Sequence, residues 1–357
     1  MTTRRGVAIG CGGILGFAWT AVALDAVERA LGWDIRTAEV LIGTSAGAEI
    51  VAALGSGRTP ADLLAALDGV PDADPVLARH VAVDPGKLPP LPAPALPGLG
   101  LIGAGVRAGS AYTALAGLLP RGRGDATWLR EYGSALANPV GWVEHPNTWL
   151  VAADAATGER VAFGANSSVR AESAAVDRSA SARAVPGGAA VSSGASADVM
   201  GQGGVGPRSA EVALGDAIAA SWAIPGWFPP VRIGGRDYVD GGAVSSVSAD
   251  LLVPLALDEV VVVAPMTSEG GASASGLDRI ERLLRAQMTR GLDREVARLR
   301  AAGTRVIRVE PGPEDLAVMG PNFMDSARRA STLMTARRTA PGRVAAAIEA
   351  SNRGDNV

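Results

Sequence analysis

A serine between glycines is the first candidate for chemistry. Residues 43–47 read GTSAG, a G-x-S-x-G pattern centred on Ser45. The apolar stretch EVLI precedes it and AEIVAAL follows it, so the motif lies between a predicted strand and a predicted helix. In that setting Gly43 and Gly47 leave room for a sharp turn, and the serine Oγ stands over a helix N-terminus that favours negative charge. Such a serine suits nucleophilic attack, although a chance glycine-rich turn has the same composition.

A serine nucleophile needs a base, and the histidines of this chain do not supply one in the expected order. Only His80 and His145 occur, no histidine follows His145, and no acidic motif separates it from Ser45. The order serine, acid, histidine of the α/β-hydrolases is therefore poorly supported. We expect both histidines to lie on the surface and the base to be another residue.

The stretch YVDGG, residues 238–242, contains a candidate base. Asp240 ends a predicted short strand and is followed by Gly241 and Gly242, so its carboxylate can come close to another backbone segment. There it could take a proton from Ser45 directly, without an imidazole. Asp-Gly pairs are also common in tight turns, and this motif alone does not decide between the two interpretations.

A third candidate is the glycine loop GCGGILG, which contains Gly10, Gly12, Gly13 and Gly16 between a predicted strand and a predicted helix. Backbone N–H groups of such a loop can bind an anion, either the oxyanion of an acyl transfer or a dinucleotide pyrophosphate. The dinucleotide fingerprint expects an acidic residue at the end of the second strand. Here that strand ends in the Ser45 turn, which weakens the nucleotide interpretation.

The same region imitates a secretion signal, because residues 6–24 carry no charge and follow Arg4 and Arg5. The glycines are poor material for a signal helix, and Asp25 and Glu28 continue the apolar pattern at helical spacing. We therefore interpret the stretch as a strand, a loop and a core helix. We expect a cytoplasmic protein without a transmembrane span, and leave transient contact with a membrane surface open.

Composition excludes several function classes. The chain has 357 residues, of which 48% are hydrophobic, and this is typical of a folded globular protein. A net charge of −3 gives no electrostatic footprint for nucleic acid. The one cysteine, Cys11, excludes an internal disulfide and a cysteine-based metal site.

The hydrophobic pattern predicts an α/β protein. Strands at 6–10 and 39–43 are each followed by a helix, which implies parallel strands joined by crossovers. Further predicted elements are two strands within 147–163, a helix ending before Pro225, a hairpin at 231–242, a buried strand at 258–266, an amphipathic helix over 277–303 broken or loosened near Gly291, a strand at 304–311 and a terminal helix. We expect one domain spanning residues 1–350.

Two segments interrupt this pattern. Residues 165–210 are dominated by alanine, serine and glycine, and we expect a low-complexity, disordered insertion. Residues 84–125 are rich in proline, glycine and leucine, which predicts an apolar flap rather than a regular central element. Its apolar residues could line an acyl-chain site or touch lipid: Leu88, Leu91, Leu96, Leu99, Leu101 and Ile102. We favour a flap packed on the core, because Arg121 and Arg123 are too few to form a basic cluster.

Together these motifs resemble the patatin-like phospholipase family. The resemblance includes the glycine loop, GTSAG about thirty residues later and VAADAATGERVAF at 151–163. Its longest block is AIAASWAIPGWFPPVRIGGRDYVDGG, from Ala217 to Gly242, and MGPNFMDSARRA at 319–330 is similar to the closing segment of bacterial members. The resemblance thus covers most of the chain.

This resemblance implies a three-layer α/β/α fold with a mainly parallel central sheet. It implies a Ser-Asp catalytic dyad, with Ser45 as nucleophile and Asp240 as general base, and an oxyanion hole formed by the N–H groups of Gly12 and Gly13. The implied reaction is hydrolysis of lipid or other acyl esters through an acyl-enzyme, and the resemblance implies no metal and no organic cofactor. Acyl transfer to another acceptor, or a catalytically weak lipid-binding or regulatory protein, stays open as an alternative.

The chain departs from the family in the glycine loop, which usually reads G-G-G-x-[K/R]-G. Aligned on Gly16, this chain reads CGGILG, so Cys11 replaces a glycine and Leu15 replaces a basic residue. The larger side chain at position 11 affects a backbone that favours glycine, and the loop lacks a cation near an anionic substrate. These changes put activity and head-group preference in question, but not the fold.

Overall fold

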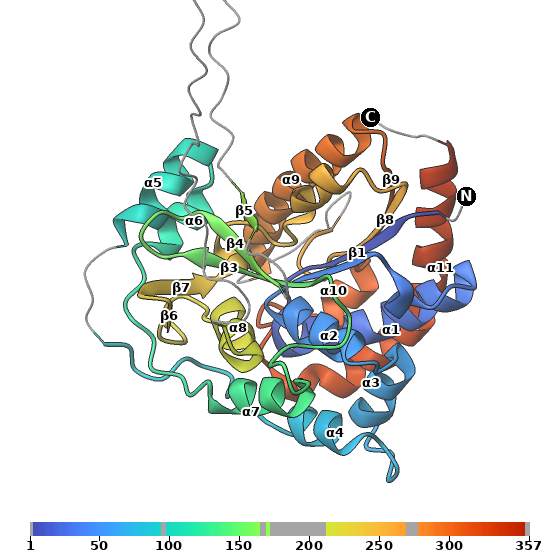
Figure 1. Cartoon of the computed structure of the whole chain (residues 1–357), viewed down its shortest axis with the longest axis horizontal. Helices are drawn as coiled ribbons and strands as arrows, with labels where there is room; N and C mark the ends of the chain where they lie inside the picture. The colour runs from blue at the N-terminus through green and yellow to red at the C-terminus, as the bar shows by residue number, and fades with distance from the viewer. Residues whose placement is uncertain (1–2, 94–97, 165–168, 172–211, 269–277, 354–357) are drawn as a thin grey trace, which may run out of the picture.

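The computed structural model describes residues 3–93, 98–164, 169–171, 212–268 and 278–353 (Figure 1). A nine-stranded sheet lies at the centre, with helices on both faces. The strands are β1 Arg5–Ile9, β2 Val40–Thr44, β3 Thr148–Asp154, β4 Arg160–Phe163, β5 Val169–Ala171, β6 Val231–Ile233, β7 Arg236–Asp240, β8 Glu259–Val263 and β9 Arg305–Val309. The helices are α1 Gly13–Leu31, α2 Ala46–Gly55, α3 Pro60–Leu67, α4 Pro75–Val81, α5 Leu99–Ala108, α6 Ala111–Ala116, α7 Thr127–Leu136, α8 Leu214–Ser221, α9 Asp278–Ala301, α10 Pro313–Met319 and α11 Arg329–Arg353.

The sheet is mainly parallel, as the sequence predicts. The strand order is β5-β4-β3-β2-β1-β8-β9, and the five strands from β3 to β9 in this order are parallel to one another. β4 and β5 continue the sheet in the antiparallel sense, and β6 and β7 form the predicted hairpin. The predicted three-layer α/β/α fold is confirmed.

Two strands, β2 and β7, pair with the same edge of strand β3, one after the other along its length. Leu41–Thr44 of β2 pair in parallel with Thr148–Val151, and Tyr238–Asp240 of β7 pair in the antiparallel sense with Ala152–Asp154. Because β2 is parallel and β7 antiparallel to β3, the two strands run toward each other. Their last residues therefore meet beside the boundary between Val151 and Ala152.

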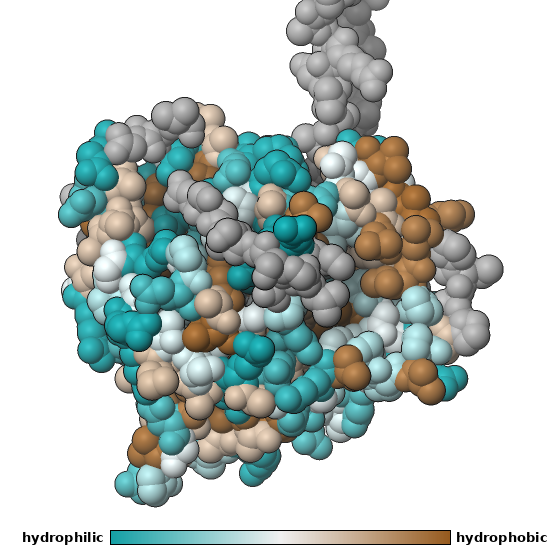
Figure 2. Space-filling model, turned by 180° about the vertical axis from the view of Figure 1, so that it is seen from behind, coloured by the Kyte–Doolittle hydropathy of each residue, from teal (hydrophilic) through white to brown (hydrophobic). Residues whose placement is uncertain are grey.

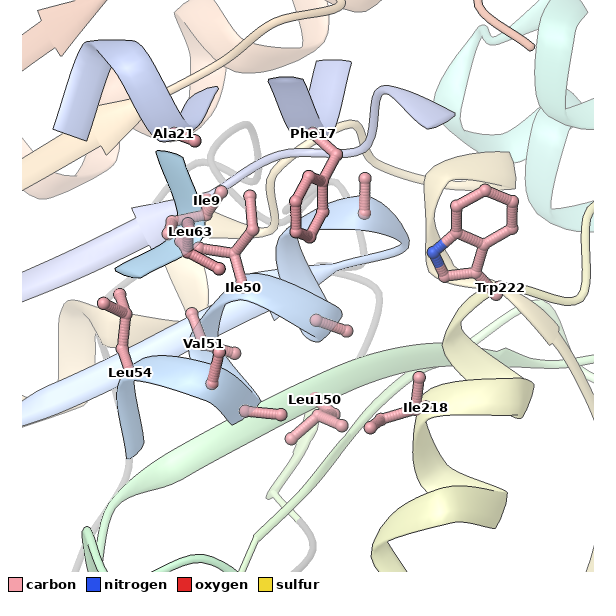
Figure 3. Packing of buried hydrophobic residues seen from close by; sticks show 14 of the residues in the cluster. Ile9, Phe17, Ala21, Ile50, Val51, Leu54, Leu63, Leu150, Ile218 and Trp222 are labelled. Carbon is pink, nitrogen blue, oxygen red and sulfur yellow. The ribbon is translucent and has the colours of Figure 1, made fainter. Parts of the chain in front are cut away.

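Alternating side chains of the strands enter two hydrophobic layers. Val261 and Val263 of β8 pack into a large core with α1, α2, α8 and α11, whereas Val260 and Val262 pack toward α9 on the other face. Figure 3 shows the first layer, to which Phe17 of α1, Ile50 of α2, Leu150 of β3 and Ile218 of α8 contribute side chains. The uncharged stretch at 6–24 thus forms β1 and most of α1, and it is buried nearly throughout.

The structure bears on the predictions for α9, for residues 84–125 and for residues 165–210. The predicted break near Gly291 is wrong, since α9 is continuous from Asp278 to Ala301. Residues 84–125 are not a featureless flap, because α5 and α6 form within them. The predicted insertion at 165–210 lies outside the described residues, except for β5. Within the described ranges, no helix has both the length and the apolar character needed to cross a membrane.

The continuity of α9 leads to a stability prediction. A Cβ added at Gly291 meets no atom within 4 Å, and the residue lies inside a regular helix. Gly291→Ala is therefore expected to raise the free energy of unfolding by about 0.5–1 kcal/mol, measured by urea denaturation. Gly303→Ala is the control, because Gly303 has a φ of 90° and a side chain at this position should destabilise the protein. Destabilisation by Gly291→Ala would contradict a regular helix at this position.

Candidate active site

Ser45 occupies a strained turn between β2 and α2. Its backbone has φ 57° and ψ −120°, a conformation that a residue with a side chain rarely adopts. The two glycines of the motif are required by close approach of the backbone. A Cβ at Gly43 would lie 2.2 Å from the Gly47 carbonyl oxygen, and one at Gly47 would lie 2.2 Å from that of Ile9. The spacing of GTSAG therefore follows from the packing of this turn.

Ser45 and Asp240 meet where β2 and β7 end. The Ser45 side chain lies close enough to the Asp240 carboxylate to influence its ionisation, both line the same cavity, and both residues are buried. The Gly242 N–H donates to Asp240 Oδ1 at 2.7 Å. Gly241 leaves room beside β3, because a Cβ there would lie 2.6 Å from the Val151 carbonyl oxygen. The structure thus brings together the candidate nucleophile and the candidate base.

The surroundings of Asp240 change its acidity. Burial raises the pKa of the carboxyl from 3.8 to about 7, since the charged form loses its hydration. The Ser45 hydroxyl and the hydrogen bond from the Gly242 N–H favour the charged form and oppose this rise in pKa, whereas the nearby carboxyl of Glu49 adds to it. Asp240 can therefore exchange a proton near neutral pH.

The end of α8 holds both residues in place. The Ser221 hydroxyl accepts a hydrogen bond from the Ser45 N–H at 2.8 Å and donates one to the Val151 carbonyl at 2.6 Å. Two residues later, the Ala223 carbonyl accepts from the Asp240 N–H at 2.9 Å. Sequence reasoning missed Ser221, because a serine inside a helix belongs to no chemical motif. Its only signal was its place in the block 217–242 that carries the family resemblance.

The glycine loop contributes unpaired N–H groups. Within the described part of the chain, the N–H groups of Gly12 and Gly13 have no acceptor, whereas Gly10 donates to Val263 and Gly16 donates to Gly12. Gly13 has a φ of 55°, and a Cβ there would lie 2.5 Å from the Phe323 ring. Two donors are thus available at the start of α1, where the helix dipole also favours an anion.

These groups surround one small cavity of about 40 Å³. Ser45, Asp240, Gly12 and Gly13 line it on the side of the sheet. Apolar and aromatic side chains from other elements close it: Tyr112, Ile224, Leu284, Met288 and Phe323. A hydroxyl beside a carboxylate, with unpaired N–H donors near both, is a combination that acyl transfer requires.

The two departures from the family loop have distinct structural consequences. Cys11 adopts no left-handed φ, since among the described non-glycine residues only Ser45, Ser248 and Ala256 do. A side chain at position 11 therefore causes no backbone strain, and burial raises the pKa of its thiol. Leu15 is fully buried in the core.

A cation nevertheless lies behind the loop. Arg285 of α9 is buried and donates to the Pro265 carbonyl at 2.6 Å, and its charge opposes the rise in the pKa of Cys11. It forms a 2.8 Å ion pair with Glu281, one turn earlier in the same helix. No pattern in the sequence links this arginine to a loop 270 residues away, so sequence reasoning could not find it.

The expectation that both histidines lie on the surface is wrong for His80. Its ring is buried, stacks on Tyr132 at 3.6 Å between ring centroids, and lies 3.1 Å from Glu49. His145 is partly buried at the start of β3, where its Nε2 lies 2.7 Å from the Ala38 carbonyl oxygen. Neither histidine lines the cavity that contains Ser45.

Comparisons with known proteins agree with the motifs. A family model described as patatin-like phospholipase matches residues 179–253, a range that contains Asp240 but not Ser45. The predicted resemblance is confirmed. The crystal structure of VipD from Legionella pneumophila is similar, with 12% sequence identity, a TM-score of 0.37, and coverage of 97% of this chain and 67% of that chain. A search of curated proteins finds no match.

The raised pKa of Asp240 predicts a pH-dependent cost of folding. Between pH 3.8 and about 7 the folded protein keeps a proton that the unfolded chain releases, so this residue lowers stability as the pH rises through that window. Asp240→Asn removes the ionisation. The unfolding free energy of the variant minus that of wild type is expected to increase by about 2 kcal/mol between pH 5.5 and pH 8. Urea denaturation at both pH values tests this, and a constant difference would contradict a perturbed carboxyl.

Proposed function

We propose that this protein is a lipid acyl hydrolase that acts through an acyl-enzyme. The match to the patatin-like phospholipase model supports this at the level of the family. The observation that carries the proposal is that Ser45 and Asp240 line one cavity together with the unpaired N–H groups of Gly12 and Gly13. The expected substrate is an ester of a lipid or another acyl ester, and no cofactor takes part.

In the proposed acylation, Asp240 takes the hydroxyl proton of Ser45 while Oγ attacks the acyl carbonyl carbon. The carbonyl oxygen becomes an oxyanion and accepts hydrogen bonds from the N–H groups of Gly12 and Gly13. When the tetrahedral intermediate collapses, Asp240 returns the proton to the leaving alcohol. The acyl group then remains bound to Ser45 as an ester.

Deacylation repeats the same steps with water. Asp240 takes a proton from a water molecule, whose oxygen attacks the acyl carbon, and the same N–H groups stabilise the second oxyanion. The proton returns to Ser45 Oγ as the carboxylic acid leaves. Because Asp240 acts on both nucleophiles directly, the mechanism needs neither His80 nor His145.

The pre-existing contacts support this chemistry. The strained turn and the Ser221 bond fix Ser45 before a substrate arrives, so little reorganisation is needed in the transition state. The ordinary φ of Cys11 argues against a distorted glycine loop. These observations favour catalysis over a purely lipid-binding role. Product analysis by thin-layer chromatography with added alcohols separates hydrolysis from acyl transfer.

Substitution of the dyad tests the proposal. Ser45→Ala removes the nucleophile and Asp240→Asn removes the base, so each is expected to lower hydrolysis of p-nitrophenyl butyrate by about a thousandfold or more. Ser45→Ala should also abolish covalent labelling by a fluorophosphonate probe. The activity is measured by release of p-nitrophenol, and the fold of each variant by circular dichroism.

Two matched variants serve as controls. Ser56→Ala changes a serine at the opposite end of α2, and Asp315→Asn changes a buried aspartate that caps α10. Both should keep activity within a few-fold of wild type. Activity retained by Ser45→Ala or by Asp240→Asn would refute the dyad. Labelling of wild type at a residue other than Ser45 would refute the assigned nucleophile.

The pKa of Asp240 predicts a pH profile. A general base must be ionised, so kcat/KM should fall about tenfold per pH unit below pH 7 and level off above it. The measurement is the initial rate of ester hydrolysis between pH 5.5 and pH 8.5, within the range in which circular dichroism shows a folded protein. A profile that is flat from pH 5.5 upward would mean that a group with an ordinary carboxyl pKa, or no carboxylate, acts as the base.

A further inference from the structure

Exposed apolar side chains gather on one surface of the molecule. Among the described residues, seven of the eleven exposed large apolar side chains lie between Leu88 and Leu119. Figure 2 shows the corresponding hydrophobic patch over α5 and α6. We call it the α5–α6 surface, and its most exposed residues are Leu91 at 88%, Leu88 and Leu99 at 78% each, and Val106 at 72%. The expectation that this segment packs on the core is therefore wrong for these residues.

Helix α5 divides its apolar side chains between two faces, because Leu101 is buried while Leu99 and Val106 are exposed. Its glycines face the protein: a Cβ at Gly100 would lie 2.1 Å from the Ala156 carbonyl oxygen, and one at Gly105 would lie 2.3 Å from the Ala114 nitrogen. Leu99 and Val106 lie on the exposed face. A surface helix of a soluble protein normally turns its large apolar residues inward. This arrangement indicates that another apolar medium covers the exposed face.

The charge of the segment points to the nature of that medium. From residue 85 to residue 124 the sequence contains four basic residues and no acidic residue, a charge of +4 in a chain of net charge −3. Arg107, Arg121 and Arg123 are exposed. An isolated backbone bridge between Ala93 and Arg121 holds this arginine beside a residue that is two positions from Leu91 in the sequence. Apolar side chains with arginines at their margin are complementary to a lipid surface that contains anionic head groups.

The α5–α6 surface also adjoins the cavity of the candidate active site. Tyr112 of α6 lines that cavity, and Leu284 and Met288 of α9 line it from the adjacent helix. The two helices are joined by a 3.3 Å hydrogen bond from Gln287 to Ser110. A lipid bound on this surface would therefore lie next to the roof of the cavity.

We propose that the α5–α6 surface docks onto lipid bilayers that contain anionic phospholipids. The role of this surface in bringing substrate to Ser45 rests on the proposed hydrolase function. Its binding to lipid bilayers does not depend on that function. The leucines and Val106 enter the interface, and the three exposed arginines contact the head groups. A protein partner or a second copy of the chain would use the same face through different chemistry, and the experiment distinguishes them.

The test measures cosedimentation with vesicles of equimolar phosphatidylcholine and phosphatidylglycerol, in a Ser45→Ala background so that no lipid is consumed. A variant with Leu99→Asp and Val106→Asp is expected to lose at least about tenfold in partition coefficient. The matched control carries Val140→Asp and Met334→Asp, which change side chains of 81% and 68% exposure outside this surface, and should bind like the parent. Arg121→Glu with Arg123→Glu should weaken binding to these vesicles more than to pure phosphatidylcholine vesicles.

Several results would overturn the proposal. These are a parent protein that does not bind the vesicles, unchanged binding by the α5 variant, or equal losses in the α5 variant and its control. A parent that is dimeric by size-exclusion chromatography, dissociates in the α5 variant and ignores vesicles would identify a second copy as the occupant. Hydrolysis of p-nitrophenyl butyrate by wild type is recorded separately. Vesicle binding without that hydrolysis would support the docking surface and refute the proposed function.

Discussion

Strands β2 and β7 run toward each other along one edge of β3, and the candidate active site depends on that meeting. Ser45 follows the end of β2 and Asp240 ends β7. Neither residue can therefore shift along the strand direction unless its strand loses the pairing to β3. The Val151 carbonyl lies at the junction, where it accepts from Ser221 and leaves room only for a glycine at position 241. Backbone pairing, rather than side-chain packing, therefore sets the separation of the hydroxyl and the carboxylate.

The same junction explains how a carboxylate could serve as a base near neutral pH. Strands on one side and the α8 end on the other exclude water from Asp240, and the loss of hydration raises its pKa. A free aspartate is a weak base, and a higher pKa makes proton transfer from a hydroxyl less unfavourable. The protein accepts a cost in stability at this position. A histidine is not needed for a proton acceptor whose pKa already lies near 7.

The sequence predicts the parts of this structure that follow from local patterns. The order of strands and helices, the Ser45 turn, the hairpin and the position of Asp240 each have a periodicity or a glycine motif of their own. Contacts between distant segments have no such signal, which is why Ser221, Arg285 and the burial of His80 were missed. The helices α5 and α6 were missed for another reason. Glycine and proline normally interrupt helices, but in α5 the glycines permit close packing against Ala114 and Ala156.

The small cavity connects the candidate site to the α5–α6 surface. The cavity of about 40 Å³ has room for a few water molecules, so an acyl chain bound at Ser45 would extend beyond it or displace its lining side chains. The roof consists of Tyr112 on α6 and of Leu284 and Met288 on α9, and separating them exposes apolar side chains. In water this exposure is unfavourable, but beside a bilayer the same side chains contact acyl chains. A lipid surface bound to α5 and α6 would therefore lower the free-energy cost of separating Tyr112 from Leu284 and Met288. This separation would take place beside the position where a lipid ester reaches Ser45.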